Sequence, residues 1–217
     1  MATVTIDTLE KEGWYLSPEG IELVKEELEN ENCTLKQFID AAKDIDLRDI
    51  ADKGFRKGDT ITKVTQLPSP LVLQIVSIQN IALPSIQQFM EKPRLLRVVF
   101  TDGSKKKWIG AEMMGQIECI NLQTPPGTKI LVTKPIDIVD QIVQLGPGML
   151  KSLGGQVQDL IQAWKAGKQF IQRSKRKNKS SLDGTKGESN DDDDAPPPFI
   201  PFKIKVKYKK RFITLYI

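Results

Sequence analysis

The chain has 217 residues, of which 39% are hydrophobic and 28% charged, a size and composition that suit one large or two small domains. It contains two cysteines and no histidine, which excludes zinc-finger spacing and all catalysis that depends on histidine. The apolar runs are too short to span a bilayer and the first residues lack a signal-peptide pattern, so we expect an intracellular protein without a membrane segment.

The net charge of +4 is unevenly distributed along the chain. Residues 1–50 carry thirteen acidic and five basic side chains, a net charge of −8, which leaves +12 for the rest. This pattern permits a polyanionic partner, although lysine-rich surfaces are also common in ordinary soluble proteins.

Residues 1–58 are predicted to form an N-terminal unit of three short helices. The first ends at Gly13, the second begins at Ser17-Pro18, and the third begins at Thr34, which forms a capping-box pattern with Gln37. Three short helices are too small to be stable alone, so we expect them to pack on the next domain. The segment 44–50, DIDLRDI, has two interpretations: a connecting turn with a local arginine–aspartate pair, or a salt bridge that locks the helical unit to the barrel.

Residues 59–150 are predicted to form a five-stranded OB-type barrel with an enlarged loop. Short runs rich in β-branched residues indicate strands at 72–78, 94–101, 106–111, 128–132 and 142–145. The first two strands are separated by about sixteen residues, 79–94, where a simple hairpin uses two to five. This partly apolar loop is the most unusual feature of the barrel.

The C-terminal part is predicted as a helix followed by a tail. An apolar stripe from Val157 to Ile171 indicates a helix within 151–174 that packs on the barrel. Residues 175–217 combine a basic block, an acidic block, the segment PPPFIPF and a lysine-rich end, a composition typical of disorder. The predicted fold class is therefore α+β: a three-helix unit on an OB-type barrel, then a helix and a disordered tail.

The sequence gives little support for an enzyme. Asp102 and Glu112 are the only acidic residues in a suggestive neighbourhood, and both fit ordinary structural roles. No phosphate-binding glycine loop, metal-ligand set or nucleophile motif is present. We therefore expect no catalytic residues, no cofactor, no metal and no small-molecule substrate.

A series of short motifs resembles the N-terminal region of the Tudor-domain-containing protein 3 family. In chain order they are GWYLS (13–17), DLR (46–48), VLQI (72–75), PRLLR (93–97), TDG (101–103), TPPGTK (124–129), LGG followed by V, L, I and W (153–164), and PPPFIPF (196–202). A more distant resemblance, mainly in the barrel, is to the RecQ-mediated genome instability protein 1 family.

The resemblance implies a non-enzymatic scaffold subunit, present in nucleus and cytoplasm, that binds a type IA topoisomerase, topoisomerase III beta in the closer family. It also implies that the loop between the first two barrel strands, here 80–92, faces that partner. The partner-binding residues expected from it are Leu83, Pro84, Ile86, Phe89 and Met90 in the loop, with Ala111, Ile142 and Val143 on the adjoining barrel face.

The alternative is an OB barrel that binds single-stranded nucleic acid directly. Such barrels combine aromatic platforms with a basic groove, and the strands here offer only Phe100 and Trp108 as aromatic residues. We therefore expect weak, auxiliary contact with DNA or RNA. The residues expected to make it are Lys105, Lys106, Lys107, Trp108, Lys175, Arg176 and Lys177.

Overall fold

The computed structural model describes residues 4–28, 33–52, 64–84, 87 and 90–179, without the side chains of 169–179. The chain divides into two units, Met1–Lys175 and Arg176–Ile217, and the fold below is that of the first. The predicted tail lies mostly outside the described residues. No helix in the described part of the chain is long and apolar enough to cross a membrane.

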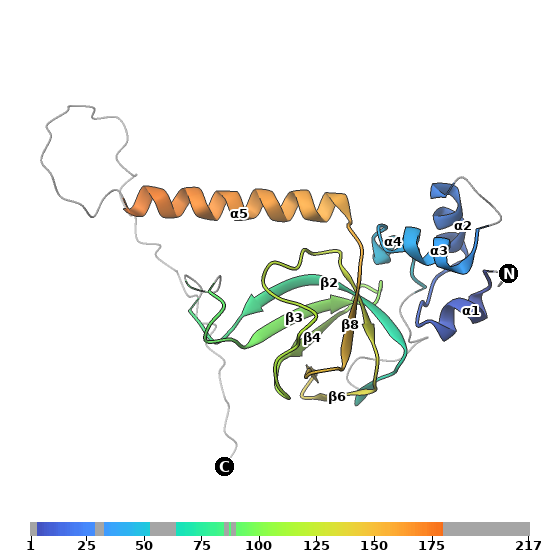
Figure 1. The fold of residues 1–217 in the computed structure, drawn as a ribbon, viewed down its shortest axis with the longest axis horizontal. Helices are drawn as coiled ribbons and strands as arrows, with labels where there is room; N and C mark the ends of the chain where they lie inside the picture. The colour runs from blue at the N-terminus through green and yellow to red at the C-terminus, as the bar shows by residue number, and fades with distance from the viewer. Residues whose placement is uncertain (1–3, 29–32, 53–63, 85–86, 88–89, 180–217) are drawn as a thin grey trace, which may run out of the picture. The chain divides into compact units, whose positions relative to one another are not determined.

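The helical unit contains four helices rather than the three predicted. They are α1 (Ile6–Lys11), α2 (Pro18–Glu27), α3 (Leu35–Ala42) and α4 (Leu47–Ile50), shown in blue in Figure 1. The predicted caps are confirmed: the Ser17 hydroxyl accepts a hydrogen bond from Gly20 N at 2.9 Å, and Thr34 and Gln37 form a capping box. The additional helix, α4, begins because Asp46 caps it. The helices of this unit share a buried core, whose side chains include Trp14, Phe38 and Ile50.

The barrel is built from one eight-stranded sheet instead of five strands. Its strands are β1 (Gln66–Leu67), β2 (Leu71–Asn80), β3 (Leu96–Thr101), β4 (Lys107–Ala111), β5 (Lys129–Val132), β6 (Ile136–Val139), β7 (Ile142–Gln144) and β8 (Leu150–Gly154). Their order in the sheet is β1-β6-β7-β4-β3-β2-β5-β8. The five predicted strands correspond to β2, β3, β4, β5 and β7. The other three, β1, β6 and β8, were not among the predicted strands: β1 has only two residues and pairs with β6, and β8 pairs with β5, contacts that local sequence does not reveal.

One long hairpin accounts for the additional strands and for the curl of the sheet. Its first arm is β5 followed by β6, its second is β7 followed by β8, and the turn lies at Asp140 and Gln141, both with positive φ. β5 pairs with β2, whereas β7 pairs in parallel with β4. The hairpin therefore supplies strands to both flanks of the central β2-β3-β4 meander, which curls the sheet into an OB-type barrel (Figure 1).

Buried polar contacts join the helical unit to the barrel. The Lys129 ammonium, fully buried, donates to the carbonyl oxygens of Lys43 (3.0 Å), Ile45 (2.7 Å) and Gly127 (3.1 Å). Gln74 of β2 accepts from Leu47 N at 2.8 Å and donates to the Asp46 carboxylate at 2.9 Å. Asp46 also pairs locally with Arg48. The local pair predicted for 44–50 is thus present, and the contact that reaches the barrel is made by Gln74 instead of a salt bridge.

The C-terminal helix, α5 (Gln158–Lys179), begins later and ends later than the predicted range 151–174. Residues 150–154 are strand β8 because they pair with β5. Near its start, Val157 and Ile161 are buried, and Lys168 lies 3.6 Å above the Trp164 ring and donates to Gln123 at 3.1 Å. The residues 175–179, assigned to the disordered tail, form the last turn of this helix.

Candidate protein-interaction site

The enlarged β2–β3 loop is closed at its base by one buried side chain, Asn80. Its amide nitrogen donates to the carbonyl oxygens of Met90 and Pro93, both at 2.8 Å. Its amide oxygen accepts from Ala82 N at 3.2 Å and Leu95 N at 3.0 Å. Four hydrogen bonds from one residue fix both ends of the loop to the sheet, so its base is ordered.

A second loop, 112–128, is held beside the first by the ion pair between Arg94 and Glu112. The Arg94 guanidinium binds both carboxylate oxygens through Nε and Nη2, and Nη2 also donates to the carbonyl oxygens of Ile117 (2.7 Å) and Ile120 (3.2 Å). Glu112 accepts two backbone N–H bonds as well, from Leu96 and Ile117, both at 2.9 Å. One buried pair therefore positions both loops.

The charges of this pair are mutually stabilised. Burial raises the pKa of Glu112, but the hydrogen bonds from Arg94 and from the two backbone N–H groups outweigh it, so the pKa lies below the usual value of 4.5. The pKa of Arg94 is raised, first through its hydrogen bond to Glu112. The pair stays ionised at neutral pH and acts as a structural element.

Four exposed apolar side chains lie in the segments that follow the strands at this end of the sheet. Ile81 N donates to Leu95 O, Glu112 N to Leu96 O and Met114 N to Leu145 O, so the ends of β2, β3, β4 and β7 lie side by side here. The exposed fractions of the apolar side chains at these ends are 43% for Ile81, 46% for Met90, 59% for Met113 and 63% for Met114. We call these four residues the apolar rim. Exposed apolar side chains that gather in one place are typical of protein-interaction surfaces.

The helical unit lies at the other end of the meander. Gly103 in the β3–β4 turn has a φ of 91°, and a Cβ at this position would lie 2.8 Å from Leu47 O of α4. This close approach requires glycine. The helical unit therefore contacts the end of the meander that is remote from the apolar rim.

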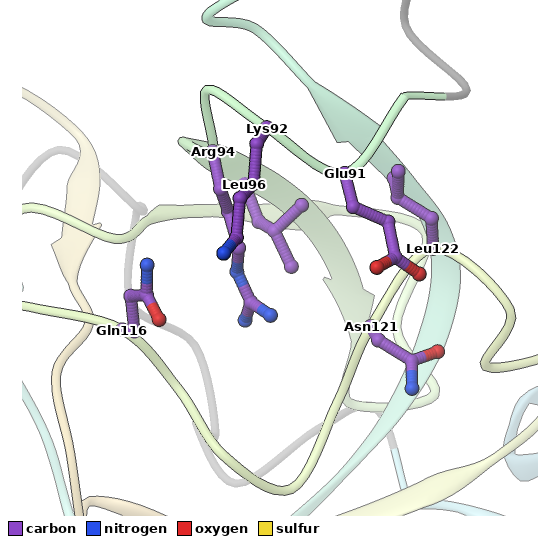
Figure 2. Close-up of a pocket in the computed structure, with 7 residues that line it drawn as sticks. All are labelled: Glu91, Lys92, Arg94, Leu96, Gln116, Asn121 and Leu122. Atoms are coloured by element: carbon purple, nitrogen blue, oxygen red, sulfur yellow. The ribbon is translucent and has the colours of Figure 1, made fainter.

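A pocket of about 230 Å³ lies between the two loops, and Figure 2 shows the side chains around it. Arg94 extends into its middle, between Gln116 on one side and Glu91 on the other. The remaining lining residues are Lys92, Leu96, Asn121 and Leu122. Its size suits a single side chain.

The predicted partner-binding residues fall into three groups. In the loop, Leu83 is half-buried, Pro84 and Met90 are exposed, and Ile86 and Phe89 lie outside the described residues. Ile142 is 38% exposed and pairs with Ile109 in the middle of β4. Ala111 and Val143 are 5% and 0% exposed, so in this structure both side chains are covered rather than presented to a partner.

The residues predicted to contact nucleic acid also differ in their exposure. Lys105, Lys106 and Lys107 are exposed in and beside the β3–β4 turn. Trp108 is buried in the barrel core, as is Phe100, so neither ring is available to stack on a base. Lys175, Arg176 and Lys177 lie in α5, whose backbone alone is described there.

Sequence reasoning missed five residues of the site: Asn80, Ile81, Arg94, Met113 and Met114. The methionines lie between the third and fourth predicted strands, where no partner-binding residue was expected, and two consecutive methionines were the available signal. Arg94 and Glu112 are eighteen residues apart, and only the β3–β4 register brings them together. Among the described residues, no group of three or more acidic or cysteine side chains is arranged to hold a metal ion.

The fold and the site define an OB-fold protein that presents two loops at the open end of its barrel. The chain belongs to the family described as RMI1, N-terminal OB-fold domain, whose model matches residues 51–168. It is 35% identical over 203 residues, or 93% of its length, to Tudor domain-containing protein 3 of Danio rerio. It is 34% identical over 162 residues, 74% of its length, to the protein of the same name from Xenopus tropicalis.

These matches confirm the resemblance found in the sequence. The chain covers 26% of the Danio rerio relative and 21% of the Xenopus tropicalis relative, so it corresponds to about a quarter of their length.

Proposed function

We propose that this protein is a non-enzymatic accessory subunit that binds a type IA topoisomerase, the beta form of topoisomerase III, and supports its action on DNA or RNA in nucleus and cytoplasm. Membership of the OB-fold family and similarity to Tudor domain-containing protein 3 support this class of function. The observation that carries the proposal is the apolar rim, formed by two loops that Asn80 and Arg94 hold in fixed positions.

The energy available from the rim is sufficient for part of a stable complex. Full burial of one methionine or isoleucine side chain contributes about 1.5–3 kcal/mol relative to exposure. Because the four rim side chains are each about half covered already, their complete burial would contribute on the order of 3–6 kcal/mol. The rest of the affinity must come from the surrounding loop residues.

The test is a binding measurement with purified topoisomerase III beta. We expect Met113→Asp, alone or with Met90→Asp, to weaken the complex at least about tenfold, because a charge would be desolvated in an apolar contact. Leu23→Asp is the matched control: Leu23 is an exposed apolar residue of α2, on the helical unit, and its replacement should leave the affinity unchanged. Unchanged binding by the Met113→Asp variant, with a native circular dichroism spectrum, would refute the proposed surface.

Direct binding of single-stranded nucleic acid is the second candidate, and the exposed Lys105, Lys106 and Lys107 favour it. The buried Phe100 and Trp108 offer no stacking platform. We therefore propose electrostatic contact only, with micromolar or weaker affinity and a steep salt dependence. Tight binding that persists at high salt would contradict this.

A further inference from the structure

The pocket between the two loops has features that the apolar rim does not explain. Around it the chain places one guanidinium, one ammonium, one carboxylate and two side-chain amides, from Arg94, Lys92, Glu91, Gln116 and Asn121. An apolar contact alone would not need them. The arrangement of these polar groups determines what the pocket is able to bind.

Two positively charged side chains line the pocket and retain unused donors. The hydrogen bonds of Arg94 to described residues use Nε and Nη2, which leaves the two N–H groups of Nη1 for another acceptor. Lys92 is exposed and makes no salt bridge with a described residue. Both side chains line the same pocket. Two cationic donors that line one pocket match the two oxygens of a carboxylate.

The negative groups near the pocket differ in their accessibility. The Glu112 side chain is 2% exposed and already accepts bonds from Arg94, Leu96 N and Ile117 N, so it forms no part of the pocket surface. Glu91 lines the pocket on the side of Asn121 and Leu122 and makes no salt bridge with a described residue. The pocket therefore presents Lys92 and Arg94 as its positive groups and Glu91 as its negative group.

We propose that this pocket binds the carboxylate of an aspartate or glutamate side chain presented by the partner protein. The carboxylate accepts from Lys92 Nζ and Arg94 Nη1, with the Gln116 amide as a further donor, and the methylene groups of the side chain contact Leu122. The proposal deepens the proposed function, because it adds a charged specificity contact beside the apolar rim. Charged contacts at the edge of an interface favour the correct partner over proteins without the matching charge, and this contact does the same.

The first test needs no partner protein. In a two-dimensional NMR titration, N-acetyl-glutamate N-methylamide should shift the side-chain amide signals of Gln116 and Asn121 in a saturable way. N-acetyl-glutamine N-methylamide, the neutral isostere, should shift them much less, and Lys92→Gln should remove the response to the glutamate compound. Equal shifts with both compounds, or no saturable shift with either, would overturn the pocket assignment.

The second test uses the opposite charges of the two neighbouring residues. Against topoisomerase III beta in about 0.1 M salt, Lys92→Gln should weaken binding roughly 3- to 10-fold, whereas Glu91→Gln should strengthen it about twofold, because it removes repulsion of the bound carboxylate. Both effects should shrink in about 0.5 M salt. The charge-matched controls are Lys134→Gln and Glu22→Gln, at exposed positions outside the pocket, which should have no effect.

The signs of these effects decide the result. If Lys92→Gln strengthened binding and Glu91→Gln weakened it, the occupant would be basic and the proposal would be overturned. The proposal would also be overturned if both variants bound like the wild type. Met113→Asp in the same assay separates the claim about the apolar rim from the claim about the pocket. If it alone weakens binding, the rim stands and the pocket assignment fails; if it binds normally, the proposed surface itself fails.

Discussion

Lys129 offers a direct test of how the helical unit is attached to the barrel. Its ammonium is fully buried and bonded only to carbonyl oxygens, so burial lowers its pKa from 10.5 to about 8, although Asp46 and Asp44 oppose the shift. The folded state therefore releases this proton more readily than the unfolded chain does. We expect the replacement Lys129→Met to change the pH dependence of stability.

The sign and size follow from proton linkage. Between pH 8 and 10.5 the unfolded chain holds more protons at this site than the folded protein, so the stability contribution of Lys129 rises with pH in this range. This contribution is fully present above pH 10.5 and is lost as the pH falls through 8. At about 1.4 kcal/mol for each pH unit of pKa difference, the change between pH 7 and pH 10 is roughly 2–3 kcal/mol.

The measurement is the difference in unfolding free energy between the wild type and the Lys129→Met variant, from urea titrations at several pH values. Methionine leaves three carbonyl oxygens without their donor, a cost that does not vary with pH, so the difference should move in favour of the wild type by roughly 2–3 kcal/mol from pH 7 to pH 10. Lys151→Met, at an exposed lysine of β8, is the control and should give a constant difference. A constant difference for Lys129→Met, or one that moves in the opposite direction, would refute the reasoning.

Two further predictions concern the loops of the candidate site. Glu112→Gln removes the charged partner of the partly buried Arg94 guanidinium and should lower the unfolding free energy by about 1–3 kcal/mol at pH 7 in urea titrations. Because the folded pKa of Glu112 is depressed, its contribution is present above pH 4.5 and lost as the pH falls through the folded value, so the two proteins should converge in acid; a difference that persists would contradict this. Asn80→Ala should leave the barrel folded but speed amide hydrogen exchange in the described parts of 81–94, because both ends of the loop lose their hydrogen bonds. Unchanged exchange there would show that Asn80 is not the clamp.

Local sequence predicted those parts of the fold that depend on local chemistry. The caps at Ser17 and Thr34 and the strands of the central meander were found from residue type and spacing. Strand β8 was not found, because Lys151 and Ser152 extend only through pairing with β5. The burial of Val143 could not be predicted for the same reason. Its apolar side chain suits either face of a strand, and only the parallel pairing with β4 reveals that it faces the core.

From the sequence, the candidate site was placed in the β2–β3 loop, because that loop is much longer than the connection of two paired strands requires. The structure adds a second loop beside it. The second loop was not anticipated, since its place beside the first depends on the pairing of Arg94 with Glu112. Met113 and Met114 belong to the site only through that contact.

The hairpin formed by β5 to β8 also has a consequence for synthesis of the chain. The meander β2-β3-β4 is complete at Ala111, yet the outer edge of β2 pairs with β5 and that of β4 with β7. Until residues 129–154 have left the ribosome, the nascent chain therefore carries two unpaired strand edges at once. Unpaired strand edges readily pair with strands of other chains, which leads to aggregation. A shortened chain that ends within the hairpin would keep that condition permanently and should aggregate. The hairpin is thus the segment on which the solubility of the whole barrel depends.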